Sequence, residues 1–402
     1  MNLNLNHILL KGIRVYSDDQ IIEDGYIKIE NEKIIELGTL SELTNEDNYQ
    51  IIELLGHFKA VPGFIDVHIH GVAGADTMDA TSEALDTMVR ALPQEGTTSF
   101  LATTMTQEGK QIEQALINAG NYIKNQYPQG TAEILGIHLE GPFVNAKMAG
   151  AQPIQHIVDP DLDLFKEWQR LSNRSIKLVT LAPEQPGGLE MIRYLKENGV
   201  IASLGHTNAT YEQVEDAIVA GANHVTHLFN QMRGLHHREP GVVGAAFLHD
   251  ELKAEIIVDG VHVRPEMVHL AYKQKRSDGL LLITDSMRAK CLKNGMYDLG
   301  GQEVTVQDGK ATLATGTLAG SILKLGHAVK NILTYTGCSL EEAIEMASVN
   351  PAKQLNIFER KGSIAAGKDA DIVILDDKME VVMTFCRGTL AYKKEDISNE
   401  SH

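Results

Sequence analysis

The sequence predicts an α/β fold, in which a (β/α)8 barrel carries a small β-sandwich domain formed by both ends of the chain. Three observations predict this arrangement. Apolar strand candidates alternate with helical patterns through the middle of the chain, which is typical of parallel βα units. There are eight such strands, which suggests a closed barrel, and the length of 402 residues suits a large barrel with additional elements. Alternating strand patterns occupy both ends, so the two ends can share one sheet.

The N-terminal part of the chain, to about residue 55, reads as short strands joined by turns. Residues 26–30 alternate apolar and polar side chains, Asn31 and Glu32 turn the chain, and residues 33–37 complete a hairpin. The C-terminal end repeats the pattern, with strands at 371–375 and 381–383 around a turn. We therefore predict a discontinuous β-sandwich domain at residues 1–58 and 352–402, and a barrel domain at residues 59–351.

Between these ends, strands and helices alternate regularly. The predicted barrel strands are residues 61–67, 98–102, 134–138, 177–181, 200–205, 223–227, 255–259 and 280–285. Helical periodicity follows most of them, at residues 82–92, 107–124, 189–198, 211–220 and 265–275. Because the catalytic side chains of such barrels lie at the carboxyl ends of the strands, functional residues are expected at those positions.

The composition argues against several classes of protein. The formal net charge of -18 disfavours a nucleic-acid binder, which would be basic. The three cysteines, Cys291, Cys338 and Cys386, are far apart and form neither a disulfide framework nor a thiolate metal site. The N-terminal segment has no signal-peptide pattern, and the sequence has no apolar run long enough to span a membrane. The prediction is a cytoplasmic protein without a membrane partner.

Histidines and carboxylates end five of the eight predicted strands. His68 and His70 alternate on the first strand and point to the same face, about 6.6 Å apart along the strand. Taken singly, each such residue also has a structural interpretation, since a lone strand histidine is most often a packed residue and Glu140 or Asp285 could cap a helix. Their common placement at one rim favours a shared site. This strand-end set is His68, His70, Glu140, His206, His227 and Asp285.

Neutral imidazole and carboxylate groups suit a divalent metal such as zinc, iron, cobalt or manganese. A bound metal ion lowers the pKa of water from ~15.7 to roughly 7 and polarises a carbonyl group. A carboxylate outside the ligand set can take the proton of that water and pass it to a leaving amine, and Asp285 fits this role by position. The sequence contains no GxSxG elbow and no Walker lysine, which argues against a serine hydrolase and a nucleotide-binding loop.

Several motifs narrow the class further. Residues 62–71, PGFIDVHIHG, resemble the opening motif of the amidohydrolase superfamily. The later motifs resemble those of the N-acetylglucosamine-6-phosphate deacetylases within that superfamily, and they follow in order over nearly the whole chain. They are HLEGPF at 138–143, GHTNAT at 205–210, THLFN at 226–230, REPG at 238–241, DGVH at 259–262, LAGS at 318–321 and GSIAAGKDAD at 362–371.

This resemblance implies an activity, the metal-dependent hydrolysis of N-acetyl-D-glucosamine 6-phosphate to D-glucosamine 6-phosphate and acetate in amino-sugar catabolism. Glu140, His206 and His227 match the principal metal ligands of the family, and Asp285 matches its catalytic acid and base. The residues that match its substrate contacts are Ala151, Gln152, Asn230, Gln231, Arg238, Asp259, His262, Leu318, Ala319 and Gly320.

Arg238 also bears on the assembly. In the resembled family the counterpart of Arg238 reaches the phosphate in a neighbouring subunit, which implies a homodimer. A guanidinium group suits this role because it binds phosphate through two parallel hydrogen bonds. Considered without the motif, Arg238 could equally pair with a neighbouring acid or face solvent.

His68 and His70 distinguish two branches of the resembled family. Some members replace both histidines and keep one metal ion, whereas this chain has both. One ion per subunit and a second ion held by His68 and His70, with Glu140 bridging, are therefore both open hypotheses. The single-metal branch also has a histidine in the segment where this chain has Gln152, and that histidine is thought to polarise the acetyl carbonyl. Since a glutamine cannot act as a cation, a second metal ion is expected to supply the polarisation here.

Two other interpretations remain open on the sequence alone. Another amidohydrolase, acting on a different N-acyl group or a cyclic amide, would share the barrel. Many such enzymes use a carboxylated lysine as the metal bridge, and no lysine ends the third or fourth predicted strand. A non-catalytic barrel acting as a scaffold would be expected to lose metal ligands, but this chain keeps the whole strand-end set. The identity of the metal and the choice between glucosamine and galactosamine epimers are not determined by the sequence.

Overall fold

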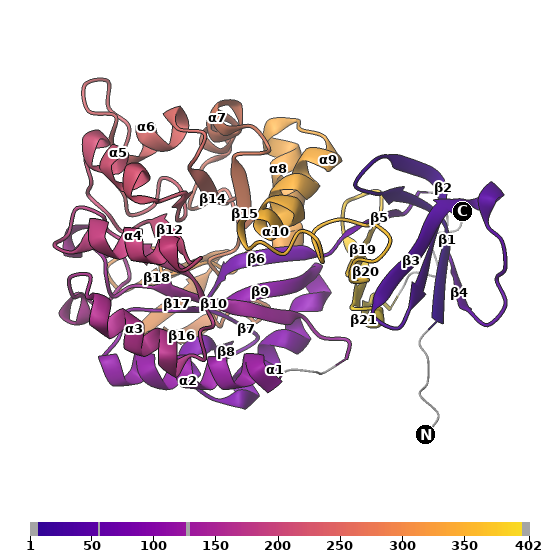
Figure 1. Cartoon of the computed structure of the whole chain (residues 1–402), viewed down its shortest axis with the longest axis horizontal. Coiled ribbons are helices and arrows are strands. Elements are labelled where there is room, and N and C mark those ends of the chain that lie inside the picture. Colours follow the sequence, from indigo (N-terminus) through magenta and orange to yellow (C-terminus); the bar gives the residue numbers. More distant parts are fainter. Residues whose placement is uncertain (1–6, 55–56, 126–128, 396–402) are drawn as a thin grey trace.

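The computed structural model describes residues 7–54, 57–125 and 129–395. Its centre is a parallel sheet of eight strands, each paired with the next barrel strand along the chain (Figure 1). They are β6 (Phe64–Ile69), β9 (Thr97–Thr104), β10 (Glu133–Glu140), β11 (Ile176–Leu181), β12 (Ile201–Leu204), β13 (His224–Val225), β14 (Lys253–Ile257) and β15 (Leu280–Ile283). The sheet closes on itself, because the backbone N–H of Asp285 donates to the carbonyl of His68 at 2.8 Å and Ile69 forms a parallel bridge with Ser286. The predicted barrel is confirmed.

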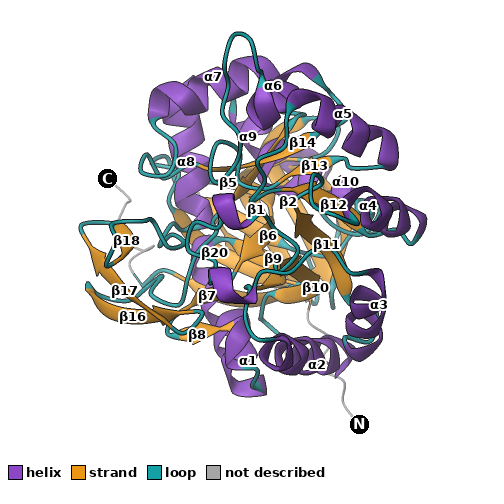
Figure 2. Cartoon of the chain, turned by 90° about the vertical axis from the view of Figure 1, so that its left-hand side faces the viewer, coloured by secondary structure: helices purple, strands orange, loops and turns teal. Residues whose placement is uncertain are grey.

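Helices cover the outside of the barrel, and Figure 2 shows the strands at the centre with the helices around them. They are α1 (Ser82–Ala91), α2 (Gly109–Asn125), α3 (Leu162–Leu171), α4 (Gly188–Glu197), α5 (Tyr211–Ala220), α6 (Gly241–Leu248), α7 (Pro265–Lys275), α8 (Leu325–Thr336), α9 (Leu340–Ile344) and α10 (Asn350–Gln354). Thr81 and Thr210 cap the first turns of α1 and α5, which fixes where these helices begin. The five helices predicted from periodicity all occur and begin within two residues of the predicted positions. Within the described ranges, no helix is long and apolar enough to cross a membrane.

The first predicted strand differs from the structure in its extent. Residues 61–62 belong to a separate strand, β5 (Lys59–Pro62), which pairs with the terminal strands rather than with the barrel. The chain passes from one sheet to the other at Gly63, where a Cβ atom would lie 2.1 Å from the Thr98 hydroxyl oxygen. A side chain at this position would collide with β9, so the transition between the two sheets requires glycine.

Both ends of the chain form one eight-stranded sheet, on the right of Figure 1. Its strands are β1 (His7–Tyr16), β2 (Ile21–Glu30), β3 (Lys33–Thr39), β4 (Gln50–Glu53), β5, β19 (Ile372–Leu375), β20 (Val381–Cys386) and β21 (Thr389–Lys393). β5 lies between β1 and β19, and both predicted hairpins are present as β2–β3 and β19–β20. Isoleucines and valines from both ends pack in one buried cluster. The exact domain limits stay a prediction, and residues 1–6, 55–56 and 396–402 lie outside the described ranges.

A buried ion cluster joins the base of the barrel to the terminal sheet. The Nζ atom of Lys361, which is 2% exposed, lies 2.9 Å from Glu133 at the start of β10 and 3.1 Å from Asp369, and it also donates to Asp371 next to β19. Arg360 donates two hydrogen bonds to the Glu133 carboxylate at 2.9 Å. Because these charges are paired in a region with little water, the cluster fixes how the two sheets meet.

A three-stranded antiparallel sheet follows β15 and was not predicted. It consists of β16 (Gly295–Leu299), β17 (Gln302–Gln307) and β18 (Lys310–Leu313), and a separate small core that includes Met105 and Met287 packs beneath it. The two hairpin turns are Gly300-Gly301 and Asp308-Gly309, each with both residues at positive φ. Such pairs match two-residue hairpin turns, so the sequence contained a signal for this sheet.

Candidate metal centre and substrate pocket

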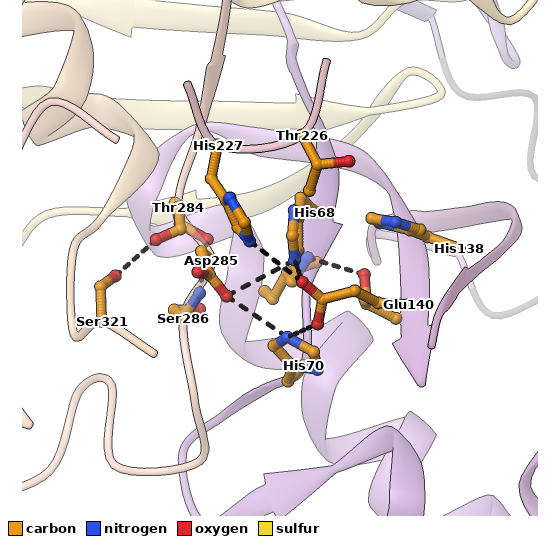
Figure 3. A network of polar contacts seen from close by, with 12 residues as sticks. His68, His70, His138, Glu140, Thr226, His227, Thr284, Asp285, Ser286 and Ser321 are labelled. Carbon is orange, nitrogen blue, oxygen red and sulfur yellow. Dashed lines mark hydrogen bonds and ion pairs between the residues drawn. The ribbon is translucent and has the colours of Figure 1, made fainter. Parts of the chain in front are cut away.

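The six residues of the strand-end set meet at the carboxyl ends of the barrel strands, and Figure 3 shows Glu140 with four of the others, His68, His70, His227 and Asp285. Three of the six lie two residues beyond the end of a strand and have positive φ: 48° at His206, 30° at His227 and 47° at Asp285. This backbone conformation is costly for residues other than glycine and concentrates at functional sites. The chain therefore accepts local strain at three separate strand ends where these side chains converge.

Glu140, His206 and His227 form the first group. The Oε1 atom of Glu140 lies 3.1 Å from the Nε2 atom of His206 and 3.3 Å from the Nε2 atom of His227, and the two Nε2 atoms are 3.1 Å apart. The Nδ1 atom of His206 lies 2.8 Å from the carbonyl of Met148, which can only accept, so Nδ1 carries a proton. In the neutral ring, Nε2 of His206 then directs a lone pair at a carboxylate oxygen. The lone pair and the carboxylate oxygen would repel each other at this distance. A cation between these ligand atoms removes the repulsion, so the group fits a divalent metal.

His68, His70 and Asp285 form the second group. The Oδ1 atom of Asp285 lies 3.3 Å from the Nε2 atom of His70 and 3.5 Å from that of His68. The same two nitrogens lie 3.3 and 3.4 Å from the carboxylate oxygens of Glu140. Glu140 therefore stands between the two groups and faces four histidines, of which Figure 3 shows His68, His70 and His227. This is the arrangement required of a carboxylate that bridges two ions.

Burial and mutual charge set the protonation of this centre. Burial disfavours the charged form of His70, but Asp285 and Glu140 raise its pKa to about 10. Burial acts to raise the pKa of Glu140, yet the charge of His68 and the close imidazoles of His206 and His227 hold that pKa well below its ordinary value. The pKa of Asp285 is likewise lowered, because His68 and His70 outweigh its burial. The carboxylates are therefore ionised, and the imidazoles of His68 and His70 carry the positive charge between them. A bound cation would supply this positive charge instead.

A second buried layer lies beneath the centre. Glu255 on β14 accepts a hydrogen bond from the Nδ1 atom of His68 at 2.9 Å, and its other oxygen lies 3.1 Å from the Nε2 atom of His224. The ring of His138 packs edge-on against His68 at 4.5 Å, and its Nε2 atom lies 2.7 Å from the hydroxyl of Thr180. Glu255 was not predicted from the sequence; the only signal was a buried carboxylate between the apolar residues Ala254 and Ile256 of β14.

The two groups open into a small pocket. Most of the residues predicted to contact substrate line it. They are Ala151, Gln152, Asn230, Gln231, His262, Leu318 and Gly320. Three further lining residues were not predicted: Met105 after β9, Gly150, and Leu299 from the three-stranded sheet. That sheet therefore forms part of the pocket wall.

Gln152 has a fixed orientation in the pocket. Its Nε2 atom donates to Glu140 at 2.8 Å, and its Oε1 atom accepts from the backbone N–H of Thr106 at 2.8 Å. The amide thus orients the carboxylate that both groups share. Gln152 remains neutral, so it supplies a hydrogen-bond donor next to the centre but no charge.

His262 places an imidazole in the pocket wall. Its Nδ1 atom donates to Asp259 at 2.7 Å, and the other oxygen of Asp259 accepts from the backbone N–H groups of Val261 and His262 at 2.8 Å. Burial disfavours the imidazolium, but Asp259 raises the pKa of His262 above its ordinary value. Asp259 is absent from the pocket lining and acts on the pocket through His262.

Besides Asp259, two other predicted residues do not line the pocket of this chain. Arg238 is exposed on the loop before α6, and its Nη1 atom lies 2.7 Å from the Nε2 atom of His237. Ala319 is fully buried, and its backbone N–H donates to the carbonyl of Ala311 at 3.0 Å. Ala319 therefore supports the segment between Leu318 and Gly320 from behind.

The mouth of this (β/α)8 barrel holds buried imidazoles and carboxylates that fit divalent ions. This combination is typical of the metal-dependent hydrolases. Residues 60–391 match the model of the amidohydrolase family. A Bacillus subtilis protein named N-acetylglucosamine-6-phosphate deacetylase is 49% identical to the chain over 386 residues, which cover 96% of this chain and 97% of that protein. The chain therefore belongs to the amidohydrolase family, on the branch of the N-acetylglucosamine-6-phosphate deacetylases.

Two further comparisons bear on the pocket. An Escherichia coli O157:H7 protein named N-acetylgalactosamine-6-phosphate deacetylase is 34% identical over 387 residues, covering 96% of this chain and 100% of that protein. A solved structure from Mycobacterium smegmatis is an aspartate-to-alanine variant of N-acetyl-D-glucosamine-6-phosphate deacetylase in complex with N-acetyl-D-glucosamine-6-phosphate. It matches with a TM-score of 0.90 and 30% identity, covering 96% of this chain and 100% of that chain.

Proposed function

We propose that this protein hydrolyses N-acetyl-D-glucosamine 6-phosphate to D-glucosamine 6-phosphate and acetate, in amino-sugar catabolism. The observation that carries the proposal is Glu140, which faces the Nε2 atoms of four histidines at the mouth of the barrel, beside a pocket with the imidazole of His262 in its wall. The relatives with this name, and the sugar phosphate bound by one of them, support the choice of substrate.

In this proposal, Glu140, His206 and His227 would hold a first divalent metal ion, and His68 and His70 would hold a second, with Glu140 between the two groups and Asp285 beside the second. Zinc, iron, cobalt and manganese all suit these ligands, and cellular supply selects among them. When bound, such an ion lowers the pKa of a water molecule and polarises the acetyl carbonyl group.

Asp285 moves the proton in the proposed reaction. Its lowered pKa keeps the carboxylate ionised, so it can accept the proton of the water that attacks the acetyl carbon. The carboxyl group then gives this proton to the sugar nitrogen as the C–N bond breaks, which releases acetate and the free amine. Gln152 keeps Glu140 in place throughout, through its hydrogen bond at 2.8 Å.

The remaining predicted residues bind the substrate. The imidazole of His262, charged with the help of Asp259, contacts the phosphate group, and the other substrate-binding residues orient the sugar and the acetyl group. They are Ala151, Gln152, Asn230, Gln231, Leu318 and Gly320, and the buried Ala319 supports Leu318 and Gly320 from behind. Arg238 binds the phosphate in the pocket of a neighbouring subunit, so the proposed assembly is a homodimer. This role agrees with the position of Arg238 on an exposed loop outside its own pocket. The proposed location is the cytoplasm.

The second candidate substrate is the galactosamine epimer, or another N-acyl or cyclic amide. The 34% identical galactosamine relative favours the epimer over the other amides. In the sugar ring the two epimers differ at one hydroxyl group, so a pocket that hydrogen-bonds that group selects between them.

Acetate release from N-acetylglucosamine 6-phosphate tests the proposal. The unphosphorylated sugar and N-acetylgalactosamine 6-phosphate serve as comparison substrates, and bound metal is quantified on the same sample. Preferred turnover of the phosphorylated glucosamine derivative is expected. Turnover of none of the three by metal-loaded protein would refute the substrate assignment, and preferred turnover of the galactosamine derivative would favour the epimer.

A further inference from the structure

Glu255 is a buried carboxylate to which the proposed reaction assigns no role. Its side chain is 0% exposed, and it collects three hydrogen-bond donors at the base of the metal centre. The Oε2 atom accepts from the Nδ1 atom of His68 at 2.9 Å and from the backbone N–H of His227 at 3.1 Å, and the Oε1 atom lies 3.1 Å from the Nε2 atom of His224. A carboxylate without solvent that satisfies three donors holds each of them in a defined direction.

The contact with His68 determines which ring nitrogen of that histidine carries the proton. A lone pair on Nδ1 would face the carboxylate at 2.9 Å and be repelled, so Nδ1 holds a hydrogen and donates it. The Nε2 atom is then the free ligand atom. It is buried, has no hydrogen-bond partner among the described residues, and lies 3.4 Å from Glu140 and 3.5 Å from Asp285. A carboxylate behind a metal-binding histidine typically orients the ring and raises its basicity.

The first group of ligands is oriented differently. The Nδ1 atom of His206 donates to the backbone carbonyl of Met148. The Nδ1 atom of His227 is buried without a hydrogen-bond partner in the described part of the chain, and Glu255 contacts only the backbone of that residue. Glu255 therefore acts on a side-chain ligand of the second group alone.

We infer that Glu255 is a positioning residue: its carboxylate keeps the proton of His68 on Nδ1 and presents Nε2 as a ligand, so that binding of the second metal ion, and not of the first, depends on Glu255. The inference rests on the second ion of the proposed function. Substitution of Glu255, which lies outside the pocket, is therefore expected to change the number of metal ions bound per chain.

The test is a zinc titration with buffered free metal, in which bound zinc per chain is measured for the parent protein, Glu255→Met and Glu255→Gln. Methionine has a similar length but no strong acceptor, whereas glutamine keeps an acceptor for His68 and for the backbone of His227. For Glu255→Met, the second ion is expected to bind about 10- to 100-fold more weakly, while the affinity for the first stays within about threefold of the parent. Glu255→Gln is expected to recover most of the loss, and the first ion serves as the internal control.

Several outcomes would overturn the inference. Two ions bound to Glu255→Met with parental affinities would mean that His68 needs no orienting carboxylate. Equal weakening of both ions, without recovery in Glu255→Gln, would assign Glu255 to packing alone. A parent protein that binds only one ion at saturating zinc would contradict the second ion itself, and acetate release by that same protein would show that the deacetylase proposal stands without it.

A second measurement needs no variant at Glu255 and so does not depend on how such a variant folds. Long-range proton–nitrogen NMR spectra of the zinc-loaded parent, assigned by comparison with His68→Gln, report which ring nitrogen of His68 carries hydrogen. The expected result is a protonated Nδ1 atom. A proton on Nε2 would refute the inference.

Discussion

His262→Gln separates recognition of the phosphate group from the chemistry at the metal centre. The imidazole lines the pocket, its side chain is 7% exposed, and it is held by Asp259 at 2.7 Å. Glutamine retains a donor of similar reach but has no charge. Because His262 bonds to Asp259 rather than to any proposed metal ligand, the variant is expected to keep its metal.

The size of the effect follows from the kind of hydrogen bond that is lost. A bond from a charged donor to an anion contributes about 1.5–3 kcal/mol, which corresponds to about a 10- to 150-fold lower kcat/KM for the phosphorylated substrate. The pocket restricts water around His262, which favours the upper half of this range. The unphosphorylated sugar makes no such contact, so its kcat/KM is expected to change less than about threefold.

The assay is acetate release from N-acetylglucosamine 6-phosphate and from N-acetylglucosamine, measured for the parent protein and for His262→Gln at equal metal content. The informative quantity is the ratio of the two kcat/KM values, because a general loss of folding or of metal cancels in it. An equal loss on both substrates, or a ratio unchanged within threefold, would refute the assignment of His262 to the phosphate.

Three further predictions follow from contacts described above. Asp259→Asn removes the main cause that raises the pKa of His262; since phosphate binding needs the imidazolium, the rise of KM with increasing pH is expected to begin at lower pH, and an unchanged pH profile of KM would contradict this. Asp285→Asn should cut turnover by roughly 10²–10⁴ while the first metal ion is retained, as measured by acetate release and metal analysis; activity within threefold of the parent would exclude Asp285 as the base. Lys361→Met removes the buried cation shared by Glu133, Asp369 and Asp371 and leaves Arg360 to pair with the first two, so urea unfolding should show a loss of about 3–5 kcal/mol; a loss under about 1 kcal/mol would show that the cluster is not needed for stability.

The barrel could be predicted because its signals are local. Most parallel strands are short apolar runs followed by a helical pattern, and even β13 (His224–Val225), with two residues, lies within the predicted segment 223–227. The strand-end set could be found for the same reason. In a closed parallel barrel all carboxyl ends lie at one rim, so residues such as Glu140 and His227 are brought together by topology alone, whatever their separation in sequence.

The features that escaped prediction depend on contacts between distant segments. Glu255 is one carboxylate in an apolar strand, and only closure of the barrel brings it against His68. Leu299 enters the pocket because a separate small core holds the three-stranded sheet against β9 and β15. Strand β5 continues without interruption into β6 in the sequence, and the change of sheet at Gly63 is visible only once Thr98 is in place. Periodicity does not report such packing partners.

The shared terminal sheet also constrains the order in which the protein can fold. Strands β1 to β5 are synthesised first, but β5 completes its pairing only with β19, which follows the whole barrel in the sequence. Until then, β5 presents an open strand edge of the kind that recruits other chains. Contacts between segments so distant along the chain form slowly. The barrel is therefore expected to assemble before β5 of the terminal sheet pairs with β19. β19, which follows the barrel in the sequence, thus covers the edge of β5, and a chain interrupted before β19 is expected to expose an aggregation-prone strand edge.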